Sequence, residues 1–206
     1  MTNANAQNDN IMTNSALVVV DMLYDFIDGS LACQNADEAV AQTLKFIDKQ
    51  TEGRKGEEHE IIDTFPILFI RDHHPADHSS FKEQGGIWPS HCVAGTRGGE
   101  IHKSLQPYAV EELTFGKGCD KAVEQYSGFE GVNNAGQSLG EILELLDTTD
   151  VYVCGIATEY CVRNTCEDLL KAGFKVHLLK DCIAYVDHEG HLKALEEMAA
   201  EGVSIE

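Results

Sequence analysis

Short apolar runs that alternate with amphipathic helical patterns constrain the fold of this chain more than any other feature. Residues 16–20 (ALVVV), 66–70 (PILFI) and 151–154 (VYVC) are almost entirely apolar, which is typical of strands buried on both faces. Between such runs, apolar side chains recur at helical spacing, as in the helix expected after residue 35. Strands that alternate with helices form right-handed βαβ units. We therefore expect a three-layer α/β/α sandwich with a mostly parallel sheet.

Weaker sequence patterns predict the remaining strands and the starts of the helices. Three further apolar runs are expected to add short strands: 113–116, 174–179 and 203–205. Helices are expected to begin near four residues: Asn35, Ser138, Glu159 and Asp187. Two of these starts, Ser138 with Glu141 and Asn35 with Glu38, have the spacing of a capping box.

Length and composition indicate one globular domain. The chain has 206 residues, of which 43% are hydrophobic and 24% charged, so a single core is expected at residues 15–206. Residues 1–14 are polar and lack the apolar segment of a secretory signal, which predicts a disordered or loosely ordered tail and a cytoplasmic protein. Residues 51–60 are expected to form a charged loop.

The charge balance narrows the range of partners. Fifteen Lys and Arg residues stand against 35 Asp and Glu, for a net charge of −20. So acidic a chain repels phosphate backbones and anionic membranes, and no apolar run reaches the length of a membrane span. We expect a small-molecule substrate, with no nucleic-acid or membrane partner. The seven cysteines include no CxxC pair and are expected to be free thiols.

Polar or reactive residues follow four of the predicted strands. These are Asp21, Asp72, Lys117 and the turn at residues 155–161. In parallel α/β sheets, ligands bind beyond the carboxyl ends of the strands. The four positions are therefore expected to share one site.

The loop after the second strand is rich in potential metal ligands. Asp72 and His74 project from the same face of an extended segment, and His78 and His91 follow. An aspartate with several imidazoles suits Zn²⁺, Fe²⁺ or Mn²⁺. Glu83 is an alternative to His78, and His73 is expected to point away. The competing interpretation is an exposed polar loop whose histidines bind nothing.

Cys161 is the candidate nucleophile. It is predicted in the first turn of the helix after the third strand, outside the apolar stripe of that helix, and a helix N-terminus favours a thiolate. Cys154 and Cys166 fit the buried pattern and are expected to be inert, and a purely structural role is the alternative for Cys161 as well. Asp21 is the candidate base, because partial burial would raise its pKa.

Lys117 and several aromatic residues complete the candidate site. Beside Asp21, the Lys117 ammonium would hold the carboxylate and stabilise developing negative charge; the alternative is a solvated lysine. Four aromatic residues lie near the predicted site: Phe26, Trp88, Tyr126 and Phe129. Trp88, in the loop between the proposed ligands, could form the wall of a pocket for a flat ligand or simply close the core beneath the loop.

Taken together, these residues resemble the nicotinamidase branch of the isochorismatase-like cysteine hydrolases. The similarity covers residues 16–184, and six motifs follow one another at family spacing: DMLYDF (21–26), DHHPADHSSF (72–81), WPSHCVAGT (88–96), FGKG (115–118), YSGF (126–129) and GIATEYCVR (155–163). The first motif departs from the family pattern Asp-x-Gln-Asn-Asp-Phe at Leu23 and Tyr24, which leaves the substrate preference open.

The resemblance implies a role for each site residue. Asp21, Lys117 and Cys161 match the catalytic triad, and Asp72, His74, His78 and His91 match the ligands of one divalent metal ion, for which zinc is favoured over iron or manganese. The N–H groups of Ala157 and Cys161 match the oxyanion hole, next to a cis peptide between Ile156 and Ala157. Phe26, Trp88 and Tyr126 match positions around a pyridine ring. The family also often forms homo-oligomers.

The implied activity is hydrolysis of nicotinamide to nicotinate and ammonia in NAD salvage, through a thioester on Cys161. One alternative is an amidase of the same superfamily that acts on another small amide, against which the metal-ligand cluster argues. The other is a non-catalytic metal-binding scaffold, against which the presence of Asp21, Lys117 and Cys161 argues.

Overall fold

A single parallel sheet forms the centre of the computed structural model, which describes residues 14–51 and 65–206. Within these residues the sheet has six strands in the order β3-β2-β1-β4-β5-β6, and all adjacent strands are parallel. The strands are β1 (Ser15–Val20), β2 (Ile67–Asp72), β3 (Thr114–Lys117), β4 (Asp150–Gly155), β5 (Lys175–Ile183) and β6 (Ser204–Ile205). Each strand predicted from the sequence is present, with its ends shifted by up to four residues.

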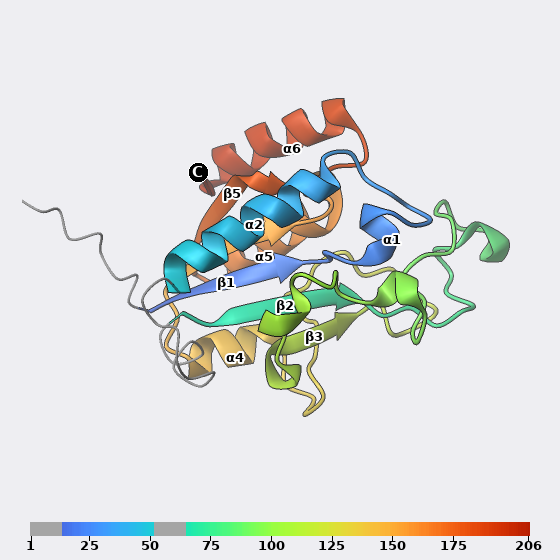
Figure 1. Ribbon diagram of the computed structural model, residues 1–206, viewed down its shortest axis with the longest axis horizontal. Helices are drawn as coiled ribbons and strands as arrows, with labels where there is room; N and C mark the ends of the chain where they lie inside the picture. The colour runs from blue at the N-terminus through green and yellow to red at the C-terminus, as the bar shows by residue number, and fades with distance from the viewer. Residues whose placement is uncertain (1–13, 52–64) are drawn as a thin grey trace, which may run out of the picture.

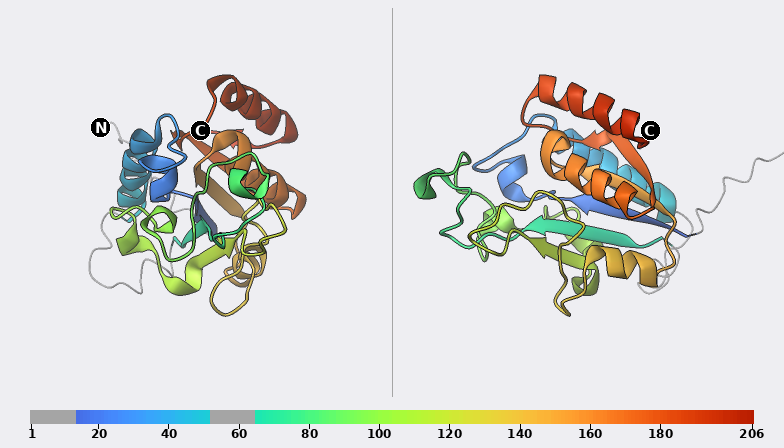
Figure 2. Two further views of the ribbon diagram at one scale, coloured as in Figure 1. Left: turned by 90° about the vertical axis from the view of Figure 1, so that its right-hand side faces the viewer. Right: turned by 180° about the vertical axis from the view of Figure 1, so that it is seen from behind.

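Helices cover both faces of the sheet (Figures 1 and 2), as the predicted three-layer fold requires. The helices are α1 (Tyr24–Ile27), α2 (Ala36–Thr51), α4 (Leu139–Leu145), α5 (Arg163–Lys171) and α6 (His188–Glu201). Short 3₁₀ turns at Lys82–Gln84, Arg97–Gly99, Gln106–Tyr108 and Glu111–Leu113 interrupt the long connections. None of the helices in the described part of the chain is both long enough and apolar enough to cross a membrane.

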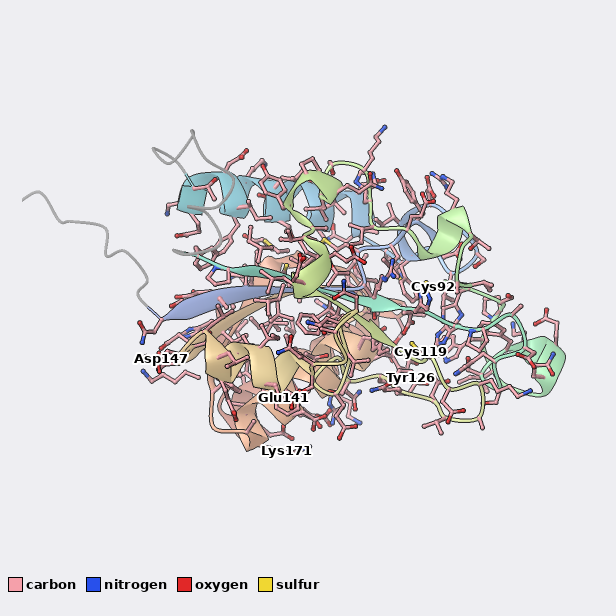
Figure 3. All side chains as sticks on the ribbon, turned by 90° about the horizontal axis from the view of Figure 1, so that it is seen from below. Cys92, Cys119, Tyr126, Glu141, Asp147 and Lys171 are labelled. Atoms are coloured by element: carbon pink, nitrogen blue, oxygen red, sulfur yellow. The ribbon has the colours of Figure 1, made fainter. Side chains whose placement is uncertain are left out.

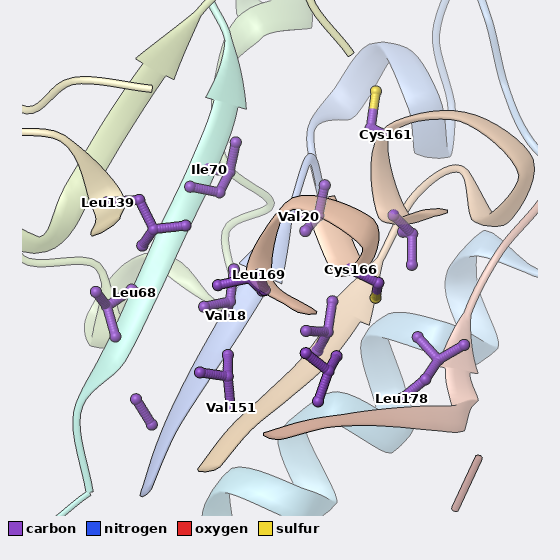
Figure 4. Packing of buried hydrophobic residues seen from close by; sticks show 14 of the residues in the cluster. Val18, Val20, Leu68, Ile70, Leu139, Val151, Cys161, Cys166, Leu169 and Leu178 are labelled. Atoms are coloured by element: carbon purple, nitrogen blue, oxygen red, sulfur yellow. The ribbon is translucent and has the colours of Figure 1, made fainter. Parts of the chain in front are cut away.

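Two hydrophobic clusters lie on opposite faces of the sheet. Successive residues of β1 alternate between them, since Val18 and Val20 belong to one cluster and Leu17 and Val19 to the other. The first cluster packs against α4, α5 and α6, and the second against α1 and α2. Figure 4 shows the first cluster, with Cys161 at one end of it. Burial on both faces explains why the β1 sequence is apolar throughout.

Two of the predicted helix caps are confirmed and a third differs, although α2 begins at Ala36, directly after Asn35, as predicted. The Ser138 side chain accepts a hydrogen bond from the Glu141 N–H, and the Glu141 carboxylate accepts one from the Ser138 N–H, so the capping box is present. Asp187 caps α6 by accepting from the Gly190 N–H at 2.8 Å. The Asn35 side chain, in contrast, donates to the carbonyl of Ile183 at 3.1 Å, which ties the start of α2 to the end of β5.

The predicted tail and charged loop fall mainly outside the described residues. Residues 1–13 of the tail and residues 52–60 of the loop lie outside the part of the chain that the structure describes. At their margins the structure corrects both predictions. Asn14 accepts hydrogen bonds on its carbonyl from the N–H groups of Thr149 and Asp150, and Thr51 is the last residue of α2.

Candidate active site

Three polar side chains meet where β1, β2 and β3 end. Asp21 directly follows β1, Asp72 ends β2 and Lys117 ends β3, where Asp72 and Lys117 are paired in register. In Figure 1 these strand ends point toward α1 and the long connection after β2. Asp21 has a φ of 48°, and its Oδ1 accepts the Asp72 N–H at 2.8 Å. The structure thus brings together residues that lie almost 100 positions apart in the sequence.

Lys117 is a buried cation between two carboxylates. Its Nζ lies 2.9 Å from Asp21 Oδ2 and forms a second ion pair with Asp72 Oδ1. Burial alone would lower the pKa of the ammonium, but the two carboxylates outweigh burial and hold the pKa of Lys117 well above its usual value. The lysine is therefore charged, and its charge is fully compensated inside the protein.

The Asp21 carboxylate has the properties expected of a general base. Burial raises its pKa to about 6, an effect that the Lys117 ammonium partly offsets. Asp21 Oδ2 lies 2.9 Å from Lys117 Nζ, on the side of the carboxylate that also meets the Cys161 thiol. A buried carboxylate with a raised pKa beside a thiol is suited to accept a proton.

Cys161 lies next to both of these groups. Its Sγ is 3.4 Å from Lys117 Nζ, and the thiol and the carboxylate oxygens of Asp21 and Asp72 lie within 4.8 Å of one another. Burial raises the pKa of the Cys161 thiol well above its usual value; Lys117 lowers this pKa and the two aspartates raise it. Burial and the two carboxylates therefore oppose the thiolate that the helix start is expected to favour, so a base beside the thiol is needed to form it.

The local backbone around Cys161 also differs from the prediction. Cys161 belongs to a π-helical turn, Thr158–Val162, and α5 begins only at Arg163. Its side chain packs against the first hydrophobic cluster, although it lies off the predicted apolar stripe. A π-helical turn widens the helix locally and is frequent at functional sites.

The turn before Cys161 places backbone groups near the thiol. Gly155 has a φ of 130°, and a Cβ at this position would lie 2.0 Å from the Val20 carbonyl oxygen, so only glycine fits. The peptide between Ile156 and Ala157 is cis, as the family resemblance implies. Within the described residues the Ala157 N–H has no acceptor, while its carbonyl accepts from Tyr160 and Val162. An oxyanion hole at Ala157 and Cys161 stays a prediction.

Asp72, His74 and His91 form a group whose donor atoms fit one metal ion. Asp72 Oδ2 lies 3.4 Å from His74 Nε2 and 3.7 Å from His91 Nε2. The Nδ1 of His74 lies 3.0 Å from the Gly118 carbonyl, and that of His91 lies 2.8 Å from the Pro89 carbonyl. With each Nδ1 directed at a carbonyl oxygen, the Nε2 atoms of both rings converge with Asp72 Oδ2 on one point, as ligand atoms around a metal ion do. The residues present therefore fit a divalent cation.

His78 does not join this group. Its Nδ1 lies 2.7 Å from Ser80 Oγ and its Nε2 lies 3.2 Å from the Val123 carbonyl, so both ring nitrogens already have partners. The alternative ligand, Glu83, is exposed and also lies outside the group. The structure thus brings three of the four predicted ligands together. The sequence offers His78 as a further imidazole in the same loop, but the fold turns its ring toward Ser80 and Val123.

An aromatic pocket opens onto Cys161, Asp72 and His91. Phe26, Trp88 and Tyr126 line it, as predicted. The Trp88 Nε1–H donates to the Tyr126 hydroxyl at 3.2 Å, and the Phe26 ring lies 5.4 Å from the His91 ring, centroid to centroid. Phe129 instead packs beneath Gly140 of α4, which supports the core.

Four further lining residues were not predicted from the sequence: Leu31, Glu124, Tyr160 and Val186. The Tyr160 ring stands edge-on to Trp88 at 5.1 Å. The position of Tyr160 directly before Cys161 is the one sequence feature that indicates a place in this pocket. Leu31 and Val186 come from connections without periodicity, so nothing in the local sequence points to them.

The metal-ligand group has its own supporting hydrogen bonds. Gln125 Oε1 accepts the Gly118 N–H at 3.0 Å, and the Gly118 carbonyl is the partner of His74 Nδ1. Asp25 Oδ2 accepts the Cys92 N–H at 2.7 Å, directly after His91. Such contacts fix the orientation of each imidazole ring.

An aspartate, a lysine and a cysteine meet at the carboxyl end of a parallel sheet, beside a metal-ligand group, which is the arrangement of a hydrolase of the α/β class. The isochorismatase domain family matches residues 15–206. The chain therefore belongs to the isochorismatase family.

Characterised relatives extend over most of the chain. A nicotinamidase/pyrazinamidase of Mycobacterium tuberculosis is 35% identical over 193 residues, which are 92% of this chain and 97% of the relative. The structure is similar to that of the Pyrococcus horikoshii pyrazinamidase in complex with zinc, with a TM-score of 0.79, 39% identity, and coverage of 94% of this chain and 98% of the other. It is also similar to PnC1 of L. infantum in complex with nicotinate, with a TM-score of 0.75, 29% identity, and coverage of 94% and 92%.

Proposed function

We propose that this protein hydrolyses nicotinamide to nicotinate and ammonia, as part of NAD salvage, through a thioester on Cys161. The observation that carries the proposal is the buried cluster of Asp21, Lys117 and Cys161, which opens onto an aromatic pocket beside the metal-ligand group. The 35% identity to a nicotinamidase/pyrazinamidase supports the substrate class.

In the acylation step, Asp21 removes the proton of the Cys161 thiol, and the thiolate attacks the carboxamide carbon. The C–S bond forms as the carbonyl electrons move to oxygen. When the carbonyl forms again, the C–N bond breaks and Asp21 gives its proton to the departing nitrogen, which leaves as ammonia. The raised pKa of Asp21, about 6, suits a group that must accept and return a proton.

In the deacylation step, Asp21 removes a proton from water, and the hydroxide attacks the thioester carbon. The C–S bond breaks, nicotinate is released and the Cys161 sulfur recovers a proton through Asp21. Lys117 remains charged throughout and stabilises the thiolate, from which its Nζ is only 3.4 Å away. The N–H groups of Ala157 and Cys161 are proposed to stabilise the oxyanion in both steps.

The proposed metal ligands are Asp72, His74 and His91. When bound, a divalent ion, which we propose to be zinc, would supply a Lewis-acid site for the pyridine nitrogen or a water molecule. Phe26, Trp88 and Tyr126 are proposed to flank the ring. Because His91 both lines the pocket and belongs to the ligand group, the ring and the ion would lie side by side.

Ammonia release from nicotinamide tests the proposal. The purified protein is assayed before chelation, after chelation, and after zinc is restored. We expect release that chelation abolishes and zinc restores. Release that survives complete metal removal would disprove the role of the metal, and no release from the zinc-loaded protein would disprove the reaction itself.

The ligand assignment has a separate test. Asp72→Ala and His74→Ala are expected to lose bound zinc, measured by elemental analysis of the dialysed protein. Asp77→Ala and His102→Ala are matched controls, because both residues lie outside the group, and they should retain wild-type zinc. Full zinc occupancy in Asp72→Ala and His74→Ala would contradict the assignment.

Leu23 and Tyr24 do not line the pocket, although they depart from the family pattern. Leu23 is fully buried and pairs with Ile101, and the Tyr24 hydroxyl accepts the Lys103 N–H at 3.2 Å. Both residues therefore support the connection near residue 100 rather than line the pocket. A cytoplasmic location, the absence of nucleic-acid and membrane partners, and assembly into homo-oligomers stay predictions.

A further inference from the structure

A second pocket lies behind the segment that carries the metal ligands. Arg71 and His73 alternate with Asp72 and His74 along one extended segment, and side chains on such a segment point alternately to opposite sides. Asp72 and His74 face the active site, whereas Arg71 and His73 line the other pocket, as expected for His73. Cys119, labelled in Figure 3, lines the same pocket next to β3.

Arg71 lacks the anionic partner that the other described arginines have. Arg97 pairs with Asp28 at 2.9 Å, and Arg163 pairs with Glu167 and Glu197. Arg71 forms no ion pair within residues 14–51 and 65–206, and its buried Nε has no hydrogen-bond acceptor there. A buried donor without an acceptor is unfavourable, so a ligand that accepts from it would be stabilised. Arg71 is therefore the one arginine in the described part of the chain without a carboxylate partner there.

The surrounding groups offer donors and an apolar wall. His73 and Asn134 line the pocket, and neither side chain makes a hydrogen bond to another residue in the described part of the chain. Ile101 and Val132 add apolar surface. Glu111 is the one carboxylate among the lining residues, yet it lies beyond ion-pair distance of Arg71. The pocket therefore combines a free guanidinium fork with neutral donors and an apolar contact surface.

We propose that this second pocket binds a small organic anion, whose carboxylate or phosphate group pairs with Arg71. A guanidinium presents its N–H groups in a planar fork that matches both kinds of oxyanion. Ile101 and Val132 would contact the apolar body of the ligand, while Asn134 and His73 donate to its remaining oxygens. The site is separate from the nicotinamide pocket and does not depend on the proposed reaction.

Two probes with the same ring distinguish the two oxyanions: benzoate and phenyl phosphate. Each is titrated into the ¹⁵N-labelled, zinc-loaded protein and followed by two-dimensional NMR. The Asn134 side-chain amide reports on the second pocket, and the indole N–H of Trp88, the one tryptophan in the chain, reports on the active-site pocket. We expect saturable shifts of the Asn134 amide with at least one probe. A response to benzoate alone assigns a carboxylate ligand, and a response to phenyl phosphate alone assigns a phosphate ligand.

Substitutions test whether Arg71 binds the oxyanion of the probe. Arg71→Gln should weaken probe binding at least about tenfold, a typical loss for a charge-assisted hydrogen bond. Glu111→Gln should tighten it, because a repulsive charge is removed. Lys193→Gln, on the exposed surface of α6, is the charge-matched control and should change nothing.

Three results would overturn the proposal. The first is the absence of saturable Asn134 shifts with both probes. The second is unchanged binding in a folded Arg71→Gln variant. If that variant fails to fold, Glu111→Gln decides the question, since unchanged or weaker binding in this variant would be the third contradicting result.

Discussion

One buried lysine organises the chemistry of this protein at the scale of single residues. Lys117 contacts Asp21, Asp72 and Cys161, and therefore links the proposed base, a proposed metal ligand and the proposed nucleophile. Its charge offsets part of the cost of burying two carboxylates, which would otherwise repel each other. The same charge lies ready for the thiolate when it forms. The catalytic and metal-binding halves of the site thus share a single cation.

Asp21→Asn tests the assignment of the base. The amide has nearly the same shape but cannot accept the Cys161 proton, so kcat should fall by about 10²–10⁴. Zinc content should stay at the wild-type level, because Asp21 is not among the proposed ligands. Asp77→Asn removes an exposed carboxylate that pairs with Lys121 and should retain wild-type kcat. A wild-type kcat in Asp21→Asn would require a different base.

Gly118→Ala tests the support of His74. Gly118 has a φ of 65°, and a Cβ there would lie 2.4 Å from Cε1 of the His74 ring. The ring must turn away, so zinc affinity should fall about 10–100-fold, as measured by competition with a chelating dye. Gly136→Ala is the matched control: its φ is 77°, but no atom lies within 4 Å of the added Cβ. Equal zinc affinity in the two variants would contradict the role of the contact between Gly118 and His74.

At the scale of elements, the order of strands and helices follows from periodicity, but several element ends do not. The apolar run of β5 stops at Leu179, yet the strand continues to Ile183 through the exposed Lys180 and Asp181. Two exposed residues in succession break the pattern on which sequence analysis relies. The π-helical turn before α5 is likewise invisible in the sequence, because its geometry depends on how the backbone leaves β4.

The positions of residues relative to the strands explain which parts of the site could be predicted. Asp21, Asp72 and Lys117 directly follow or end strands, and strand ends converge at one edge of a parallel sheet. His78 and Leu31 lie in irregular connections, where spacing along the chain does not determine orientation. For this reason the sequence places His78 with the ligands although the structure positions its ring apart from them, and the sequence gives no sign of Leu31.

The capping box of α4 gives a test of local stability. Ser138→Ala removes the acceptor for the Glu141 N–H and should lower the free energy of unfolding by about 1 kcal/mol. Urea titration at constant metal content measures the change. Ser204→Ala, at an exposed position of β6, serves as the control and should alter stability by less than about 0.5 kcal/mol. An equal effect of the two substitutions would mean that the cap contributes nothing.

At the scale of the whole molecule, the charge of −20 is the dominant electrostatic feature. Like charges repel more strongly in the compact state than in the extended chain, and dissolved salt screens this repulsion. The melting temperature of the zinc-loaded protein should therefore rise as sodium chloride increases from about 0.05 M to about 0.5 M, across which the Debye length shortens several-fold. Potassium chloride should give the same shift. A melting temperature that stays constant or falls in both salts would contradict this interpretation.

The proposed mechanism depends on Cys161 as the nucleophile. The most direct test is ammonia release from nicotinamide by Cys161→Ala, with zinc measured in the same sample. Because Cys161 is not among the proposed metal ligands, we predict full zinc content and no turnover above background. Turnover at the wild-type rate in the zinc-loaded variant would contradict the proposed mechanism.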